Sequence, residues 1–204
     1  CAEFVEALAE LPINLTFYPL RNSYDIWERT YETMPETVEV MLYMGREGLE
    51  EFLRTRNNFY DYIIVSRVHN MEFFRSVMEK DSNILGNARL IYDAEAVSAP
   101  REILYRQLQG ETLSEDTQAT MISDELALAH NCHKVITVSE AESELYAKKG
   151  ITNTTVLGHK LASTPTPALF GERKDILFIG ALRDDNSPNV DSILWFVNDV
   201  LPLI

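Results

Sequence analysis

Cysteine is scarce in this 204-residue sequence, and so are glycine-rich loops and basic side chains. The two cysteines, Cys1 and Cys132, are too few for a disulfide framework. Proteins with few cysteines and no such framework usually keep their thiols reduced inside the cell. We therefore expect a cytoplasmic protein whose core is held by packing alone.

Basic residues are outnumbered by acidic ones. Lys and Arg total 18 against 32 Asp and Glu, which gives a formal net charge of −14. A field of that sign repels phosphate backbones and anionic lipid surfaces, so we expect no nucleic-acid partner. No apolar run approaches the roughly 20 residues that cross a bilayer, so no membrane span is predicted.

Motifs for several kinds of chemistry are also missing. The sequence has no Walker loop, no glycine-rich phosphate loop and no serine nucleophile elbow. His130, Cys132 and His133 are ligand-type residues, but they are crowded together, and no second Cys or His cluster occurs elsewhere. Because a zinc site needs about four ligands in tetrahedral geometry, we expect no metal and no bound cofactor.

What the sequence does contain is an alternation of strand and helix patterns. Helical spacing of apolar residues occurs near residues 4–8, 24–34, 46–56, 99–109, 115–130 and 140–148. Strand patterns occupy residues 13–18, 37–43, 61–66, 88–93, 134–139 and 154–158. The near-continuous apolar run at 61–66 is typical of a parallel strand covered on both faces. Alternation of this kind predicts an α/β fold with a Rossmann-like, doubly wound parallel sheet.

A second folding unit begins near the end of the sequence. Residues 1–158 are predicted to form one domain, and residues 159–174, with Pro165, Pro167 and Gly171, a linker. Residues 175–183 then read as a buried strand and 190–203 as an amphipathic helix. A strand that enters a helix through a polar turn is the opening of another Rossmann-like unit. Both ends of the sequence lie within helical patterns, so we expect each domain to be truncated.

Polar residues follow the predicted strands at their carboxyl ends, where ligands bind in open parallel sheets. Two pairs of such residues on neighbouring strands, with a later arginine and a third pair, form one wall of a candidate ligand-binding cleft: Ser66, Arg67, Asp93, Glu95, Arg101, Ser139 and Glu140. Gly180, Arg183 and Asn189 in the second unit form a candidate diphosphate site, because arginines and helix N-termini attract anions.

Each of these residues also has a structural interpretation. Ser66 and Ser139 are good helix N-caps, and Asp93 could cap the element that follows it. Arg67 could form an ion pair with a neighbouring carboxylate. Ser187 as N-cap and Pro188 at the first helical position explain the start of the last helix without a ligand.

Taken in order, four segments resemble the GT-B glycosyltransferases, in particular the large retaining group called glycosyl transferases group 1 or family 4. The segments are Phe59-Tyr-Asp-Tyr-Ile-Ile-Val-Ser-Arg67, Ala88-Arg-Leu-Ile-Tyr-Asp-Ala-Glu-Ala-Val-Ser-Ala-Pro-Arg-Glu102, Ala129-His-Asn-Cys-His-Lys-Val-Ile-Thr-Val-Ser-Glu-Ala-Glu142, and the strand at 175–183 with Ser187-Pro-Asn-Val-Asp191. The resemblance covers most of the chain.

The resemblance implies a metal-independent enzyme of polysaccharide biosynthesis that moves a sugar from a nucleotide-diphosphate donor to a glycan, lipid-linked or small-molecule acceptor with retention of configuration. The first domain would be the acceptor side, and the donor would bind mainly to residues beyond Ile204. The full-length protein could then associate with a membrane peripherally. Many relatives carry Asp and His where this chain has Ala96 and Ser98, so no histidine contact is implied.

Two other functions stay open at this point. A nucleotide-sugar epimerase shares the two-domain architecture and would act on the donor alone. A non-catalytic glycan-binding module would keep the fold without the chemistry.

Overall fold

The computed structural model describes residues 2–21, 26–158, 167, 169–182, 185 and 187–204. The chain divides into two compact units, Cys1–Leu161 and Ala162–Ile204.

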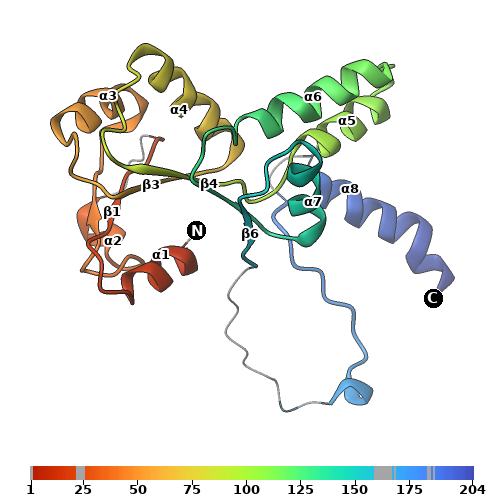
Figure 1. Cartoon of the computed structure of the whole chain (residues 1–204). Helices are drawn as coiled ribbons and strands as arrows, with labels where there is room; N and C mark the ends of the chain where they lie inside the picture. Colours follow the sequence, from red (N-terminus) through yellow and green to blue (C-terminus); the bar gives the residue numbers. More distant parts are fainter. Residues whose placement is uncertain (1, 22–25, 159–166, 168, 183–184, 186) are drawn as a thin grey trace. The chain divides into compact units, whose positions relative to one another are not determined.

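The first unit alternates helices and strands along most of its length (Figure 1). Its elements are α1 (Ala2–Ala9), β1 (Thr16–Phe17), α2 (Trp27–Thr30), β2 (Glu39–Val40), α3 (Gly45–Thr55), β3 (Tyr62–Ser66), α4 (Val68–Lys80), β4 (Arg89–Asp93), α5 (Ala99–Leu108), α6 (Glu115–Ala127), β5 (Lys134–Thr137), α7 (Glu140–Lys148) and β6 (Thr154–Val156).

All strand pairs that the structure describes are parallel. Strands β3, β4, β5 and β6 form one sheet in chain order, and β1 pairs with β2 in a second, two-stranded sheet. The prediction of an α/β fold with parallel strands is therefore confirmed. Parallel register also places Ser66 beside Asp93, and Asp93 beside Ile136, at one edge of the larger sheet.

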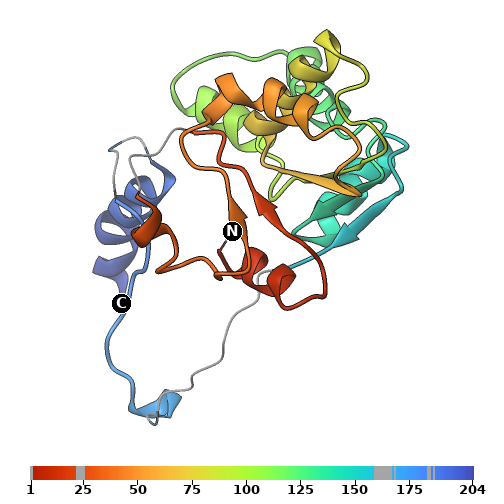
Figure 2. The same ribbon diagram turned by 90° about the vertical axis from the view of Figure 1, so that its left-hand side faces the viewer.

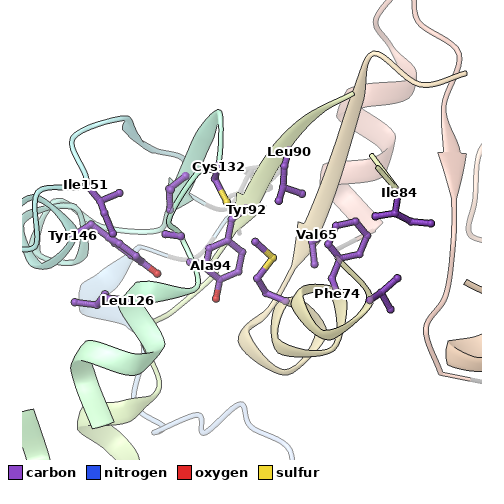
Figure 3. Packing of buried hydrophobic residues seen from close by; sticks show 14 of the residues in the cluster. Val65, Phe74, Ile84, Leu90, Tyr92, Ala94, Leu126, Cys132, Tyr146 and Ile151 are labelled. Carbon is purple, nitrogen blue, oxygen red and sulfur yellow. The ribbon is translucent and has the colours of Figure 1, made fainter. Parts of the chain in front are cut away.

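Helices α3, α4, α6 and α7 supply most of the core that packs on the larger sheet. Figure 3 shows side chains of this core, with Val65 and Phe74 close together and Tyr92 between them and Leu126. Tyr92 and Val135 are completely buried, as is Tyr146 on α7. Burial of a large apolar side chain contributes about 1.5–3 kcal/mol, so this cluster dominates the stability of the unit.

The prediction that the strand at 61–66 is covered on both faces is wrong. In β3, Val65 is buried, whereas Tyr62 is 50% and Ile64 37% exposed. Strand β4 alternates in the same way, with Leu90 and Tyr92 buried between less buried neighbours. One face of the sheet therefore packs on the main core, and the other is partly open, although the strand is apolar on both faces.

Helix α4 was not among the predicted segments, although its sequence carries a helical signal. Met71, Phe74 and Val77 recur every three residues and are all buried in the core. In Figures 1 and 2 α4 lies beside α3. The polar residues that follow β3 therefore begin a helix, but the interpretation of Ser66 as its N-cap is wrong, because Arg67 occupies the cap position and the Ser66 hydroxyl donates to Asp93.

The second unit departs from the prediction of a buried strand at 175–183. Residues 175–182 form no strand, and Leu177 and Ile179 are 81% and 86% exposed. A strand needs a neighbour for its backbone hydrogen bonds, and the described part of this unit contains no other strand. Residue 183 lies outside the described residues.

The helix predicted at 190–203 is partly confirmed. It begins earlier and changes hydrogen-bonding pattern along its length, as α8 (Pro188–Trp195), a π-helical turn (Phe196–Val200) and a 3₁₀ turn (Leu201–Leu203). The predicted linker contains one short 3₁₀ turn, Phe170–Glu172. Most of its other residues before 169 lie outside the described part of the chain.

Candidate functional site

The ends of β3 and β4 are joined through Ser66 and Asp93. The Ser66 hydroxyl donates a hydrogen bond of 2.8 Å to Asp93 Oδ2. The Arg67 N–H donates to the Asp93 carbonyl at 2.9 Å, which extends the strand pairing by one residue. The side chains of Ser66 and Asp93 are half-buried. The Asp93 carboxylate is therefore held in position by Ser66 and remains partly accessible to solvent. A carboxylate held in this way can accept hydrogen bonds from hydroxyl groups of a ligand.

Arg67 and Glu95 form a second link across the same edge. The Arg67 guanidinium Nε lies 3.0 Å from Glu95 Oε2, and the two side chains are 52% and 32% exposed. Both residues have left-handed backbone conformations, with φ of 77° and 53°. Such conformations are uncommon for residues other than glycine and often occur at functional sites. Arg67 thus forms the ion pair that its structural interpretation predicted, in a position open to a ligand.

Glu142 ties the loop after β4 to the loop after β5. Its Oε1 accepts a hydrogen bond from the Val97 N–H at 3.0 Å, and its Oε2 accepts one from the Val138 N–H at 3.3 Å. Ser139 accepts a hydrogen bond from the Glu142 N–H at 3.3 Å and so caps α7. The hydroxyl of Ser139 is therefore occupied by the helix, as its structural interpretation predicted.

Arg101 and Glu140 are not brought into this cluster. Both are exposed, Arg101 on α5 and Glu140 in the first turn of α7. Within the residues that the structure describes, neither side chain makes a hydrogen bond or ion pair with another candidate. The structure thus groups Ser66, Arg67, Asp93 and Glu95, and leaves the other acceptor-side candidates at its border.

Glu125 is a structural residue that the sequence did not reveal. Its carboxylate is only 8% exposed and lies at the N-terminus of α5. It accepts hydrogen bonds from the Ser98 N–H at 2.7 Å, the Ser98 hydroxyl at 3.0 Å and the Ala99 N–H at 2.5 Å. Ser98 therefore does not cap α5 itself, and a residue 26 positions away from Ala99 does so instead.

Two buried tyrosines lie near Glu125 in the core. The hydroxyls of Tyr92 and Tyr146 have no hydrogen-bond partner among the described residues. Burial raises the pKa of both phenols well above its usual value, and the nearby Glu125 adds to this effect. Both side chains are therefore neutral and act as core residues, not as acids or bases.

Cys132 is equally unsuited to chemistry. It is buried, and burial raises the pKa of its thiol to about 11, although the neighbouring Arg75 opposes the shift. Arg75 donates a hydrogen bond of 3.4 Å to Cys132 Sγ and also donates to the carbonyls of Leu128 and His130, which follow α6. Among the described residues no group of His, Cys, Asp or Glu is arranged to hold a metal ion.

Two donor-side candidates lie close together in the second unit. The Asn189 side-chain amide donates to the Ala181 carbonyl at 3.1 Å. A Cβ on Gly180 would lie 2.8 Å from the Phe178 ring and 3.3 Å from Asn189 Cγ, so the glycine lets both side chains lie close to the backbone. Ser187 caps α8 by accepting from the Val190 N–H at 3.4 Å. Arg183, the third candidate, lies outside the described residues.

Comparison with protein families, curated proteins and solved structures finds no match to this chain. Within the described part of the chain, no helix is both long and apolar enough to cross a membrane.

Proposed function

We propose that this chain is the acceptor-side domain of a retaining GT-B glycosyltransferase, followed by the start of its donor-binding domain. The observation that carries the proposal is the paired arrangement of Ser66 with Asp93 and Arg67 with Glu95 at the carboxyl ends of β3 and β4. These residues lie in two of the segments that resemble the family, and ligands of open α/β folds bind at this edge.

The chemistry of the cluster suits a sugar hydroxyl. Asp93 is held by Ser66 and keeps acceptor capacity on its carboxylate, while Arg67, the residue after Ser66, has a guanidinium group that pairs with Glu95 and supplies further donors. Such a pair would orient one acceptor hydroxyl by accepting its proton in a hydrogen bond and donating to a neighbouring oxygen. Correct orientation of a nucleophile supplies a large share of a transfer reaction's rate enhancement.

The donor half of the reaction is proposed to depend on a second domain, for which Gly180, Arg183 and Asn189 are the candidate residues in this chain. The leaving nucleoside diphosphate would be stabilised by positive groups and helix N-termini, with no metal ion. The 204-residue chain alone is accordingly expected to lack transferase activity. The proposed enzyme is cytoplasmic, with a Rossmann-like first domain.

The test uses the longest natural protein that carries this chain, with a panel of nucleotide-diphosphate sugars and glycan acceptors. Release of nucleoside diphosphate is measured as the acceptor concentration is varied. We expect Asp93→Asn to raise the acceptor KM by about tenfold or more and to leave the donor KM within about twofold, since it removes one charged hydrogen-bond acceptor. Glu144→Gln, an exposed change of the same kind on α7, is the matched control.

Two outcomes would contradict the proposal. Formation of an epimerised nucleotide sugar without any acceptor would indicate an epimerase. Glycan binding without turnover of any donor would indicate a non-catalytic module.

A further inference from the structure

A pocket in the first unit adjoins the Ser66 and Asp93 cluster, and none of the candidate site residues named above lines it. It has a volume of about 310 Å³ and is lined by residues that follow β1, β2 and β3 in turn: Leu20, Arg21, Arg46, Glu47, His69 and Asn70. Asn70 links the pocket to the Ser66 and Asp93 cluster, because its side-chain amide donates to the Ser66 carbonyl at 2.9 Å.

The pocket is basic in a strongly acidic chain. Two arginines and one histidine line it against one carboxylate, whereas the whole sequence carries a net charge of −14. Within the part of the chain that the structure describes, neither Arg21 nor Arg46 forms an ion pair, unlike Arg54, Arg56, Arg67 and Arg106. Their charges are therefore not neutralised by a carboxylate of the described residues.

Arg46 is held in place by a contact that leaves its donors usable. Its guanidinium carbon lies 5.0 Å from the centre of the Phe73 ring on α4, so the charged group stacks on an aromatic face. A stacked guanidinium is partly immobilised before a ligand arrives, which lowers the entropic cost of binding.

The N-termini of two helices add partial positive charge to the pocket. Arg46 and Glu47 lie in the first turn of α3, and His69 and Asn70 lie in the first turn of α4. Neither helix has a side-chain cap, since Met44 and Arg67 occupy the cap positions. The two helices lie side by side in Figures 1 and 2, so both positive helix ends add to the potential that the arginines create.

Glu47 is the one group lining the pocket that opposes an anion. Burial, with a smaller effect of Glu47, raises the pKa of Tyr18 to about 12, and the Tyr18 hydroxyl donates to the Gly45 carbonyl at 2.8 Å. Tyr18 is therefore neutral and contributes no charge. Glu47 is exposed, and its negative charge partly offsets the positive charge of the arginines. Removal of this carboxylate therefore tests whether the pocket binds an anion.

We propose that this pocket binds an oxyanion of the substrate whose hydroxyl lies at Asp93. The oxyanion is either a phosphate ester or a carboxylate. That this substrate is the acceptor of a sugar transfer rests on the proposed function. Arginine is suited to this task because its planar guanidinium donates two parallel hydrogen bonds to such groups. The acceptor is thus a sugar or lipid-linked sugar that bears an acidic group next to the hydroxyl that reacts.

The oxyanion site is tested without any activity measurement. Inorganic phosphate, glucose 6-phosphate, glucuronate and neutral glucose are titrated into the 204-residue chain, and the His69 ring and Asn70 amide signals are followed by NMR. We expect the anions, but not glucose, to shift these signals, with affinity that falls as ionic strength rises. Glucose 6-phosphate, the phosphate ester, and glucuronate, the carboxylate, are compared directly, so their relative affinities identify the preferred anion.

Two variants with opposite expected effects make this test sharp. Arg21→Met with Arg46→Met is expected to weaken phosphate binding at least about tenfold, since two charged donors are lost. Glu47→Gln is expected to strengthen it about two- to fivefold, because a nearby like charge is removed. Arg29→Met with Arg89→Met, two exposed arginines outside the pocket, is the matched control for net charge.

The outcomes separate this inference from the proposed function. Unchanged His69 and Asn70 signals, or equal phosphate affinity in the double variant and its control, would overturn the oxyanion site whatever the protein transfers. Glu47→Gln tests the site even where the double variant is unstable, since phosphate affinity that does not rise would overturn it. A transferase that uses neutral and acidic acceptors equally well would also overturn the inference. Oxyanion binding in a protein that turns over no donor would instead overturn the transferase proposal and leave the site standing.

Discussion

The Glu125 carboxylate on α6 accepts a hydrogen bond of 2.5 Å from the backbone N–H of Ala99, the first residue of α5. The same carboxylate accepts from the N–H and hydroxyl of Ser98, so one buried side chain closes the start of another helix. This contact holds the segment that begins at Asp93 and Glu95 and continues into α5. The candidate site therefore depends on a residue that lies outside it.

Replacing Glu125 by alanine is expected to destabilise the chain by about 2–4 kcal/mol, since three donors lose a charged acceptor at a buried position. Urea unfolding followed by circular dichroism measures the change. Asp124→Ala removes the same charge from an exposed neighbour and is expected to change stability by no more than about 0.5 kcal/mol. Equal effects of the two substitutions would show that the Glu125 cap contributes nothing.

For the buried Tyr146 we predict that removing a polar group does not lower the stability of the chain, in contrast to Glu125. Tyr146→Phe is expected to leave stability unchanged or to raise it by up to about 1 kcal/mol, because the hydroxyl that it removes has no partner in the described part of the chain. Tyr18→Phe makes the same chemical change but loses the 2.8 Å bond to the Gly45 carbonyl, and is expected to cost about 1 kcal/mol. If urea unfolding shows Tyr146→Phe to be the more damaging of the two, this prediction is wrong.

The ion pair between Glu39 and Arg56 predicts part of the acid sensitivity. Arg56 donates to both Glu39 oxygens, at 2.5 and 2.7 Å, and lowers the pKa of Glu39 from its usual value near 4.5 to about 2. A lowered pKa in the folded state means that the carboxylate stabilises the fold above pH 4.5 and that this contribution disappears as the pH falls towards 2. Because Glu39 is half exposed, solvent screening limits the contribution to about 0.5–1 kcal/mol.

Glu39→Gln measures this contribution directly. Its difference in unfolding free energy from the unaltered chain is expected to be about 0.5–1 kcal/mol at pH 6 and close to zero at pH 2. Glu36→Gln, at an exposed carboxylate without an ion pair among the described residues, is expected to show no such change with pH. A difference for Glu39→Gln that is the same at both pH values would refute the linkage.

The regular elements of the first unit could be predicted because their signals are local. A few adjacent apolar residues predict each of β3, β4 and β5, and the segment from Ser139 to Glu142 predicts the cap of α7. Their parallel pairing then brings Ser66 beside Asp93 without further information. Of the seven acceptor-side candidates nominated in this way, the structure pairs Ser66 with Asp93 and Arg67 with Glu95.

What could not be predicted depends on contacts between distant segments. Nothing near Glu125 or Ala99 in the sequence indicates that the two meet, since 26 residues separate them. Arg21 and Arg46 lie in segments that follow different strands, and only the folded chain places them in one pocket. The strand at 175–183 was predicted from apolar content, but a strand also needs a partner, and the sequence pattern does not report whether one is present.

The anomeric configuration of the transferred sugar is the most direct test of a retaining glycosyltransferase. The longest natural protein that carries this chain is incubated with each nucleotide-diphosphate sugar and an acidic or neutral acceptor, and the anomeric proton of the first product is observed by NMR. We expect a new glycosidic bond with the anomeric configuration of the donor, and loss of product formation at low acceptor concentration in Asp93→Asn. An inverted product, or no glycosidic product from any donor, would contradict the proposed function.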